Sequence, residues 1–270
     1  MKNDTLPSDT MFWNIPTSNL SLGDEIHVWC ICLDIAQSYV QHLYHVLSLD
    51  EKRRGEEFCF QKDQEHFIVA HGLLRLILAH YLRRDPRELR FCCNYYGKPS
   101  LDKDSCGGTL NFNLSHSHGI ALLAVARGRD IGIDLERIRD DLEDGQIAEH
   151  FFSHREVAML RVLPLSLRKE AFFTCWTRKE AYAKARGLGL SLPLDQFTVS
   201  LAPGEPAMLL DCNSDPNEVA RWTLRTLPPI PGYAAAFAVE RCSCQLKYWR
   251  WVPSWKERAT VFQEHQCMLE

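Results

Sequence analysis

Long apolar runs are absent from this sequence. Its most apolar helical stretch, LLRLILAHYL, is short and contains Arg75, whereas a membrane helix needs about 18 apolar residues. The first residues, MKNDTLPSDTMFW, have no apolar segment of the kind found in a signal peptide. We therefore expect a soluble, cytoplasmic protein with no membrane partner.

An excess of basic residues is also absent. The chain has 31 Lys and Arg against 35 Asp and Glu, which gives a formal net charge of -4. Proteins dedicated to nucleic acids present a basic surface, so a nucleic-acid partner is not expected. With 270 residues, 46% of them hydrophobic, the chain can bury a core as one large or two modest domains.

Paired cysteine motifs are the third absence. The eleven cysteines are scattered, and no two have the CxxC spacing of a zinc ribbon or a thioredoxin-like site. Cys30 and Cys32, like Cys242 and Cys244, are one residue apart in strand-like runs. We expect these thiols to be reduced, as is usual in the cytosol.

The order of hydrophobic patterns predicts two similar halves. In each half a strand-like run is followed by helical periodicity and then by further strands. The segment Arg127–Asp130 joins two strand-like runs, which we interpret as a hairpin. We therefore predict an α+β fold with two similar α/β subdomains related by a pseudo-twofold axis. The predicted boundaries are 1–126, 127–250 and a C-terminal tail, 251–270.

One helical stretch carries charge on the side that a helix normally buries. It reads FFTCWTRKEAYAKARGLGL from Phe172 to Leu190. Its apolar side also holds Glu180 and Lys184, with Lys179 at the margin. A Glu–Lys pair four residues apart is also a common helix-stabilising contact. We rank that interpretation second, because a carboxylate with two ammonium groups beside aromatic residues suits phosphates and a metal.

The segment Gly132-Ile-Asp-Leu-Glu136 places two carboxylates on one face of a predicted strand. Alternate residues of a strand share a face, so Asp134 and Glu136 project together, about 6.5–7 Å apart. Carboxylates at that spacing can both reach one Mg²⁺ ion, which prefers oxygen ligands. The alternative is the exposed polar face of a half-buried strand, which is the commoner case for such a pair alone.

A polar segment, NLSHSH, begins at Asn113 and is expected to form a turn after a strand. Such a turn can offer Ser115, His116 and backbone N–H groups to a phosphate. Ordinary turn chemistry is one alternative. A zinc pair of His116 and His118 is another, but no matching ligand cluster follows it. A Ser–His nucleophilic dyad is a weak third, because neighbours in sequence rarely reach attacking geometry.

Four motifs in a fixed order carry a family resemblance. They are GKP, FNLSHS, GIDLE and F-x₃-W-x₂-KEA-x₂-K-x₂-G-x-GLS. From about residue 48 to 200 the chain resembles the 4′-phosphopantetheinyl transferases, specifically the long type that activates peptide and polyketide synthetases. The second half of the resemblance, GIDLE with WTRKEAYAKARGLGLS, is highly specific.

The resemblance implies an enzyme that moves the 4′-phosphopantetheine arm of coenzyme A onto a serine of an acyl or peptidyl carrier protein. The other product would be 3′,5′-ADP. By resemblance, Asp134, Glu136 and Glu180 bind Mg²⁺ together with the coenzyme pyrophosphate. Glu180 is also the implied base for the attacking serine. Lys184 is implied to contact the pyrophosphate and to help the leaving group, and Lys179 is predicted as a further ligand of the coenzyme.

The resemblance also implies ligands for the rest of the coenzyme. Ser115 and His116 match phosphate contacts, and the turn Gly97-Lys98-Pro99 matches the adenine side. Arg54 aligns with a basic residue that holds the 3′-phosphate.

The N-terminal motif departs from the family pattern at two positions. His66 stands where family members often have Arg, and Glu51 replaces a basic residue of some relatives. Both departures concern the grip on the 3′-phosphate.

Two other functions are compatible with the same residues. One is a coenzyme A-binding regulator without transfer activity, and the other is a Mg²⁺-dependent coenzyme A hydrolase. Because predicted ligands fall on both sides of Arg127–Asp130, we expect a monomer with one coenzyme site between its halves.

Overall fold

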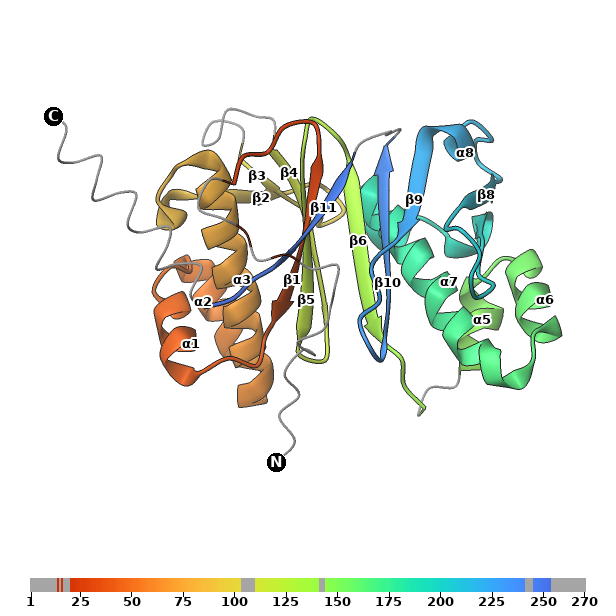
Figure 1. The fold of residues 1–270 in the computed structure, drawn as a ribbon, viewed down its shortest axis with the longest axis horizontal. Coiled ribbons are helices and arrows are strands. Elements are labelled where there is room, and N and C mark those ends of the chain that lie inside the picture. Colours follow the sequence, from red (N-terminus) through yellow and green to blue (C-terminus); the bar gives the residue numbers. More distant parts are fainter. Residues whose placement is uncertain are drawn as a thin grey trace, which may run out of the picture.

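Two β-sheets lie face to face between two layers of helices (Figure 1). The computed structural model describes residues 14, 16, 20–102, 110–140, 144–240 and 245–253. One sheet has the strand order β11-β1-β5-β4 and is covered by α1–α3; the other has the order β6-β10-β9 and is covered by α5–α7. Two short pairs, β2-β3 and β7-β8, lie outside these sheets.

The elements have the following bounds. Those before residue 130 are β1 (Ile26–Cys32), α1 (Gln37–Tyr44), α2 (Leu49–Glu56), α3 (Gln61–Leu82), η1 (Pro86–Glu88), β2 (Phe91–Cys93), β3 (Pro99–Leu101), β4 (Leu110–Ser117) and β5 (Ile120–Arg127). Those after it are β6 (Ile131–Arg137), α5 (Asp144–Phe151), α6 (His154–Val162), α7 (Leu165–Arg186), η2 (Gly189–Ser191), η3 (Leu194–Gln196), β7 (Phe197–Val199), β8 (Leu209–Cys212), α8 (Glu218–Arg221), β9 (Trp222–Thr226), β10 (Tyr233–Glu240) and β11 (Leu246–Arg250).

The strands are apolar on both faces because both faces are covered. On β1, Trp29 and Ile31 belong to the core under α3, whereas Val28 and Cys30 belong to the core between the sheets. That central core continues into the second sheet, where Ile133 is one of its members. Alternation along each strand therefore gives one set of side chains to a helix and the other set to the opposite sheet.

The two halves share a repeated frame, as predicted for two similar subdomains. Each begins with a seven-residue strand, β1 or β6. Each contains a 22-residue helix, α3 or α7, followed by a residue in the left-handed conformation. The short helix before each long one starts with a capping box, Ser48–Glu51 in α2 and Ser153–Glu156 in α6.

The same capping glutamates hold a cation of the long helix in each half. Glu51 binds Arg75 at 2.7 Å, and Glu156 binds Lys179 at 2.7 Å. All four side chains are at least nine-tenths inaccessible to solvent. The two halves therefore repeat a buried ion pair at matching places. The residue types differ between the two pairs, Arg75 in one and Lys179 in the other, so the repeat is hard to see in the sequence.

The predicted hairpin at Arg127–Asp130 is wrong. The strands on either side of Arg127–Asp130 do not form a hairpin, because β5 pairs with β1 and β4 while β6 pairs with β10. The chain changes sheets at that turn, so that the apolar face of β6 covers the first sheet. The true hairpin joins β4 to β5 through His118 and Gly119, which both have positive φ.

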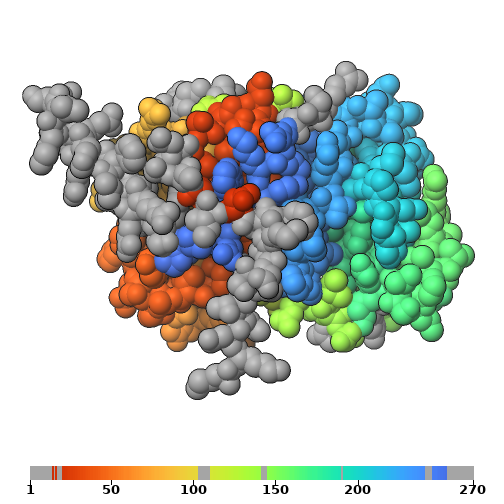
Figure 2. Space-filling model, in the orientation of Figure 1, coloured from red at the N-terminus to blue at the C-terminus, as the bar shows by residue number. Residues whose placement is uncertain are grey.

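The C-terminal strand does not follow the predicted boundary at residue 250. Strand β11 lies in the first sheet, parallel to β1, with Trp29 opposite Trp249. Figure 2 shows these blue residues lying against the red N-terminal part of the molecule. Strand β11 therefore forms one edge of the first sheet, although it follows the second sheet in the sequence. Most of the predicted tail, 254–270, lies outside the described residues, as does most of the first 19.

Within the described ranges, no helix combines the length and the apolar character that a membrane crossing requires. The cytoplasmic location stays a prediction.

Candidate active site

The predicted carboxylates lie where strand β4 of the first sheet meets strand β6 of the second. The two strands are joined by side chains: Ser115 Oγ donates to Asp134 Oδ1 at 2.9 Å, and Ser117 Oγ donates to Glu136 Oε2 at 3.0 Å. Asn113 Oδ1 accepts the backbone N–H of Ile133 at 2.7 Å. Ser115 therefore lies on a strand, and the prediction that Ser115 and His116 form a turn is wrong. Their alternation along β4 sends the serines toward β6.

Helix α7 reaches this seam because Gly132 has no side chain. A Cβ atom at Gly132 would lie 2.1 Å from the carbonyl oxygen of Ala181 and 2.3 Å from the backbone nitrogen of Ala185. No other residue permits so close an approach of helix and strand without a shift of the backbone. The glycine thus brings Glu180 and Lys184 of α7 up to the carboxylates of β6.

Lys184 makes the central contact of the site. Its Nζ lies 2.5 Å from Asp134 Oδ1 and 3.1 Å from Ser115 Oγ. Asp134 is 3% exposed, and its second oxygen, Oδ2, has no hydrogen-bond partner among the described residues. One oxygen of Asp134 is thus saturated, while the other is buried and open to a further ligand.

Burial and mutual repulsion raise the pKa of two neighbouring carboxyl groups. For Glu136 the causes are burial and then the charge of Asp134, opposed by the Ser117 hydrogen bond and by Lys184. For Glu180 they are burial and then Asp134, opposed by Lys184, with Glu136 adding to the rise. Three carboxylates therefore interact around one ammonium group, a concentration of negative charge that a divalent cation would offset.

The three carboxylates are chemically suited to bind a magnesium ion. In the described part of the chain, their side chains are not gathered into a coordination site. Asp134, Glu136 and Glu180 supply the hard oxygen ligands that Mg²⁺ prefers, and Asp134 Oδ2 is an orphaned acceptor. Among the described residues, no three His, Cys, Asp or Glu side chains are gathered closely enough to hold an ion as they stand. Lys184 occupies part of that space instead.

A group of basic side chains, which includes His116, His71 and Arg54, lies on the side of the first half. Burial lowers the pKa of His116, and the charges of Lys184 and His66 lower it further. Burial also lowers the pKa of His71 to about 4; Glu51 opposes this shift, while Arg54 and His116 add to it. These effects place both imidazoles within the field of other cations, a setting that favours a bound anion.

The sequence interpretation missed His71. Its ring stacks on Phe67 with centroids 4.1 Å apart, and the Arg54 guanidinium lies 5.7 Å from the same Phe67 ring. Phe67 and His71 are four residues apart on α3 and so share a face. That spacing was visible in the sequence, but nothing there showed that this face meets Arg54.

The two departures from the family motif have structural explanations. Glu51 caps α2 and binds the buried guanidinium of Arg75 at 2.7 Å. It therefore belongs to the frame of the first half. His66 Nε2 lies 2.9 Å from Asp34 Oδ1, and Lys62 Nζ lies 3.4 Å from the same oxygen.

Lys179 is not brought to the carboxylate cluster. Its ammonium is fully buried in the second half, where it contacts Glu156 and donates to the carbonyl oxygen of Phe197 at 2.6 Å. The prediction that Lys179 binds the coenzyme therefore does not fit the structure. The sequence placed it at the margin of the helix face, and packing turns it inward.

Lys98 also has an internal partner. Its Nζ donates to the carbonyl oxygens of Ile131 at 3.1 Å and Ala185 at 3.0 Å. In the same turn, Asn94 Nδ2 donates to the carbonyl oxygen of Gly187 at 2.7 Å. The predicted adenine-side turn, Gly97-Lys98-Pro99, thus lies against the C-terminal end of α7, where a cation is favourable.

A cavity of ≈ 640 Å³ opens beside His116, between the two halves. His66 and Phe67 of α3, His116 of β4, Arg137 of β6 and Tyr233 of β10 are among the residues that line it. Ligands of the size of coenzyme A need a space of this order. His116 and Arg137 of the lining are the sequence neighbours of Ser115 and Glu136, so the cavity lies next to the carboxylates without including them in its lining.

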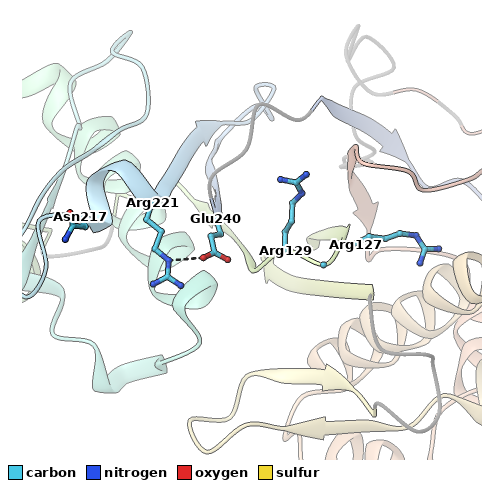
Figure 3. Close-up of a pocket in the computed structure, with 6 residues that line it drawn as sticks. Arg127, Arg129, Asn217, Arg221 and Glu240 are labelled. Carbon is cyan, nitrogen blue, oxygen red and sulfur yellow. Dashed lines mark hydrogen bonds and ion pairs between the residues drawn. The ribbon is translucent and has the colours of Figure 1, made fainter.

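A second hollow, of ≈ 600 Å³, lies near the β5–β6 turn. Figure 3 shows that the side chains of Arg127, Arg129 and Arg221 point in different directions. Arg221 is paired with Glu240 at 2.8 Å. The guanidinium groups do not converge, so this hollow is not a comparable anion site.

The site is typical of an enzyme that acts on a phosphate-containing substrate with the help of a metal: buried carboxylates face cations across a seam between two halves. Comparisons with known proteins identify the family. A model described as 4′-phosphopantetheinyl transferase superfamily matches residues 130–238, and one described as 4′-phosphopantetheinyl transferase, N-terminal, matches residues 35–127.

Three relatives illustrate the similarity. The 4′-phosphopantetheinyl transferase HetI of Nostoc sp. is 39% identical over 240 residues, which cover 88% of this chain and 98% of HetI. The 4′-phosphopantetheinyl transferase Sfp of Bacillus subtilis is 28% identical, with 75% of this chain and 86% of Sfp covered. The 4′-phosphopantetheinyl transferase gsp of Aneurinibacillus migulanus is 31% identical, with 59% and 65% covered.

The chain belongs to the 4′-phosphopantetheinyl transferase superfamily and is of the Sfp-like type. The predicted resemblance and the predicted α+β class are confirmed, and the chain is a transferase. The two alternatives, a coenzyme-binding regulator and a coenzyme A hydrolase, find no support in these comparisons.

Proposed function

We propose that this chain transfers the 4′-phosphopantetheine group of coenzyme A to a serine of acyl or peptidyl carrier proteins and releases 3′,5′-ADP. The observation that carries the proposal is the contact across the seam, where Ser115 of the first half and Lys184 of the second meet on Asp134. This contact joins a predicted phosphate ligand to the predicted metal ligands at one point.

Magnesium is the proposed cofactor, held by Asp134, Glu136 and Glu180. When bound, Mg²⁺ would neutralise the pyrophosphate and make its phosphorus a better electrophile. The raised pKa values of Glu136 and Glu180 support this assignment, because neighbouring negative charge contributes to both shifts. A cation among these groups relieves the same repulsion.

Glu180 is the proposed general base for the carrier serine. A carboxylate within hydrogen-bond reach of the serine hydroxyl can take its proton as the hydroxyl attacks. Glu180 stands on α7, whose position relative to β6 is set by the close packing at Gly132. Lys184, one turn further along, is proposed to stabilise the charge on the leaving pyrophosphate oxygen.

The rest of the coenzyme is proposed to bind along the first half. Ser115 and His116 take a phosphate of the pyrophosphate, and Arg54 takes the 3′-phosphate. His71, stacked beside Arg54 through Phe67, adds a cation once an anion raises its pKa. The Gly97-Lys98-Pro99 turn offers its backbone to the adenine side, since the Lys98 ammonium is held by carbonyl oxygens.

The decisive experiment incubates a panel of apo carrier proteins with the enzyme, coenzyme A and Mg²⁺ and measures their intact masses. A gain of one phosphopantetheine on the carrier, abolished by excess chelator, is the expected result. Free phosphopantetheine without a modified carrier would identify a hydrolase, and no product with any carrier would overturn the transfer. Undiminished transfer in metal-free buffer would overturn the magnesium assignment alone.

A further inference from the structure

Lys184 is bound to a group that the proposed function assigns to the metal. Its Nζ is 2.5 Å from Asp134 Oδ1, while Ser115 Oγ, 3.1 Å from the same nitrogen, also donates to that oxygen. The Lys184 side chain is 31% exposed, whereas that of Asp134 is 4% exposed. A lysine stem has four rotatable carbons, so the ammonium can change partners without a movement of α7.

The single positive charge of the Lys184 ammonium does not balance the three carboxyl groups around it. Asp134, Glu136 and Glu180 interact with one another and with Lys184, so one positive charge faces three carboxyl groups. Asp134 Oδ2 also remains without a partner among the described residues although it is buried.

We propose that Lys184 is a tethered counter-ion, which holds Asp134 in the metal-free enzyme and leaves it when a divalent cation and coenzyme A bind. The inference rests on the proposed function, since it needs both ligands to meet at Asp134. Without the metal, the ammonium is the direct partner of the buried Asp134 carboxylate. In the loaded state the same ammonium is released for the coenzyme pyrophosphate.

The exchange makes Lys184 a competitor of the metal and a ligand of the coenzyme. Removing the ammonium therefore changes the two affinities in opposite directions: the metal binds more tightly and coenzyme A binds more weakly. A purely structural role for Lys184 predicts that both affinities fall, because a damaged seam serves neither ligand. The opposite signs are the distinguishing result.

The test measures binding of Mg²⁺ alone, by calorimetric titration at neutral pH, to the full chain and to Lys184→Met. We expect Mg²⁺ to bind the variant about tenfold more tightly, well within the interaction of two unit charges in contact near a protein surface. We expect coenzyme A, titrated in saturating Mg²⁺, to bind the variant about tenfold more weakly, which corresponds to one lost charged hydrogen bond. An unchanged or weaker Mg²⁺ affinity overturns the exchange.

Two control variants separate the contact from the general field of the lysine. Lys184→Arg keeps a cation in reach of Asp134 and is expected to keep the Mg²⁺ affinity of the unmodified chain. Arg139→Gln removes a cation whose charge acts on Glu136, and it is expected to tighten Mg²⁺ binding much less than Lys184→Met. Equal tightening in both variants overturns competition at Asp134.

Folding and function are controlled separately. Circular dichroism shows whether Lys184→Met is folded, and Lys184→Gln, with a polar chain of similar length, repeats the titration if it is not. A chain that modifies carrier proteins but shows no tighter Mg²⁺ binding in either variant overturns the counter-ion alone. Opposite affinity changes in a chain that modifies no carrier overturn the transfer alone.

Discussion

The two halves share one frame, but only the second half puts charge between its first strand and its long helix. Strands β1 and β6 both have seven residues and align from end to end. Trp29 then takes the place of Asp134, and Ile31 takes the place of Glu136. The first pair belongs to the hydrophobic core under α3, whereas the second pair forms the proposed metal site.

The long helices show the same contrast. Helices α3 and α7 both have 22 residues. In that alignment Leu76 takes the place of Glu180, and His80 takes the place of Lys184. The first half thus has a partly buried leucine and a histidine where the second half collects its predicted catalytic groups.

A difference at one strand position helps to explain how the second half accommodates its site. Gly132 of β6 lets the backbone of α7 approach, whereas β1 has His27 at the equivalent position. The His27 ring is buried, with Nδ1 2.7 Å from the hydroxyl oxygen of Tyr81 of α3. The comparison teaches that buried ion pairs hold the shared frame, while a few side chains beside it decide which half carries chemistry.

Replacing the proposed base is expected to have the largest effect. Glu180→Gln should lower kcat for carrier modification by about 10²–10⁴-fold, the usual contribution of a general base, and loss of a metal ligand adds to this. Steady-state assays with a carrier protein would show the loss in kcat rather than in KM for coenzyme A. Near-normal turnover would mean that another group takes the serine proton.

The matched control is the equivalent position of the first half. Leu76→Gln puts the same amide on α3, where the side chain packs against the first core. It is expected to lower the free energy of unfolding and to leave the turnover of the folded enzyme close to normal. An equal loss of turnover in both variants would remove the functional distinction between the halves.

Breaking either buried ion pair is expected to destabilise the chain without a specific effect on the coenzyme. Lys179→Met and Arg75→Met each leave a buried glutamate without its cation. Losing one partner of a buried pair costs about 3–5 kcal/mol of unfolding free energy. Denaturant unfolding measures the loss, and Lys179→Met with Glu156→Gln should recover part of it. A change in KM for coenzyme A without a loss of stability would restore Lys179 to the site.

Removing Arg54 is expected to have a moderate effect that depends on the substrate. Arg54→Ala should raise KM for coenzyme A about tenfold, which corresponds to one lost charged hydrogen bond. It should spare dephospho-coenzyme A, which lacks the 3′-phosphate. Initial-rate measurements with the two substrates decide this. Equal effects on both would make Arg54 a surface cation only.

The smallest expected effect is a change in the pH dependence of stability. Burial lowers the pKa of His27 from 6.5 to about 4. Between these pH values the unfolded chain binds more protons at His27 than the folded chain does. The free energy of unfolding therefore decreases as pH falls from 6.5 toward 4. Replacing this histidine in His27→Gln should flatten the fall in unfolding free energy over that range. The same slope in both proteins would assign the effect to His71 or His116.

The candidate site could be named from local sequence pattern, whereas the connections between the sheets could not. GIDLE and KEA fix residue types at strand and helix spacing, so Asp134, Glu136 and Glu180 could be named from local pattern and resemblance. The sheet change after β5 and the return of β11 to β1 depend on which apolar faces meet. Alternation alone does not tell a strand which neighbour it pairs with.

The misplacement of Lys179 has a similar cause. Lys179 looks like a ligand in a sequence because a lysine carries its charge wherever it stands. Its partner, Glu156, comes from a helix that only the fold brings near. His71 was missed for the converse reason, since its neighbour Arg54 stands on another helix.

The most direct test of a single site divided between unequal halves is a calorimetric titration of the full chain with coenzyme A in Mg²⁺, with the mass in solution measured by light scattering. Ligands from β4 of the first half and from β6 and α7 of the second predict one equivalent of coenzyme A per monomeric chain. Two equivalent sites per chain, or binding that requires a dimer, would contradict the division of one site between the two halves.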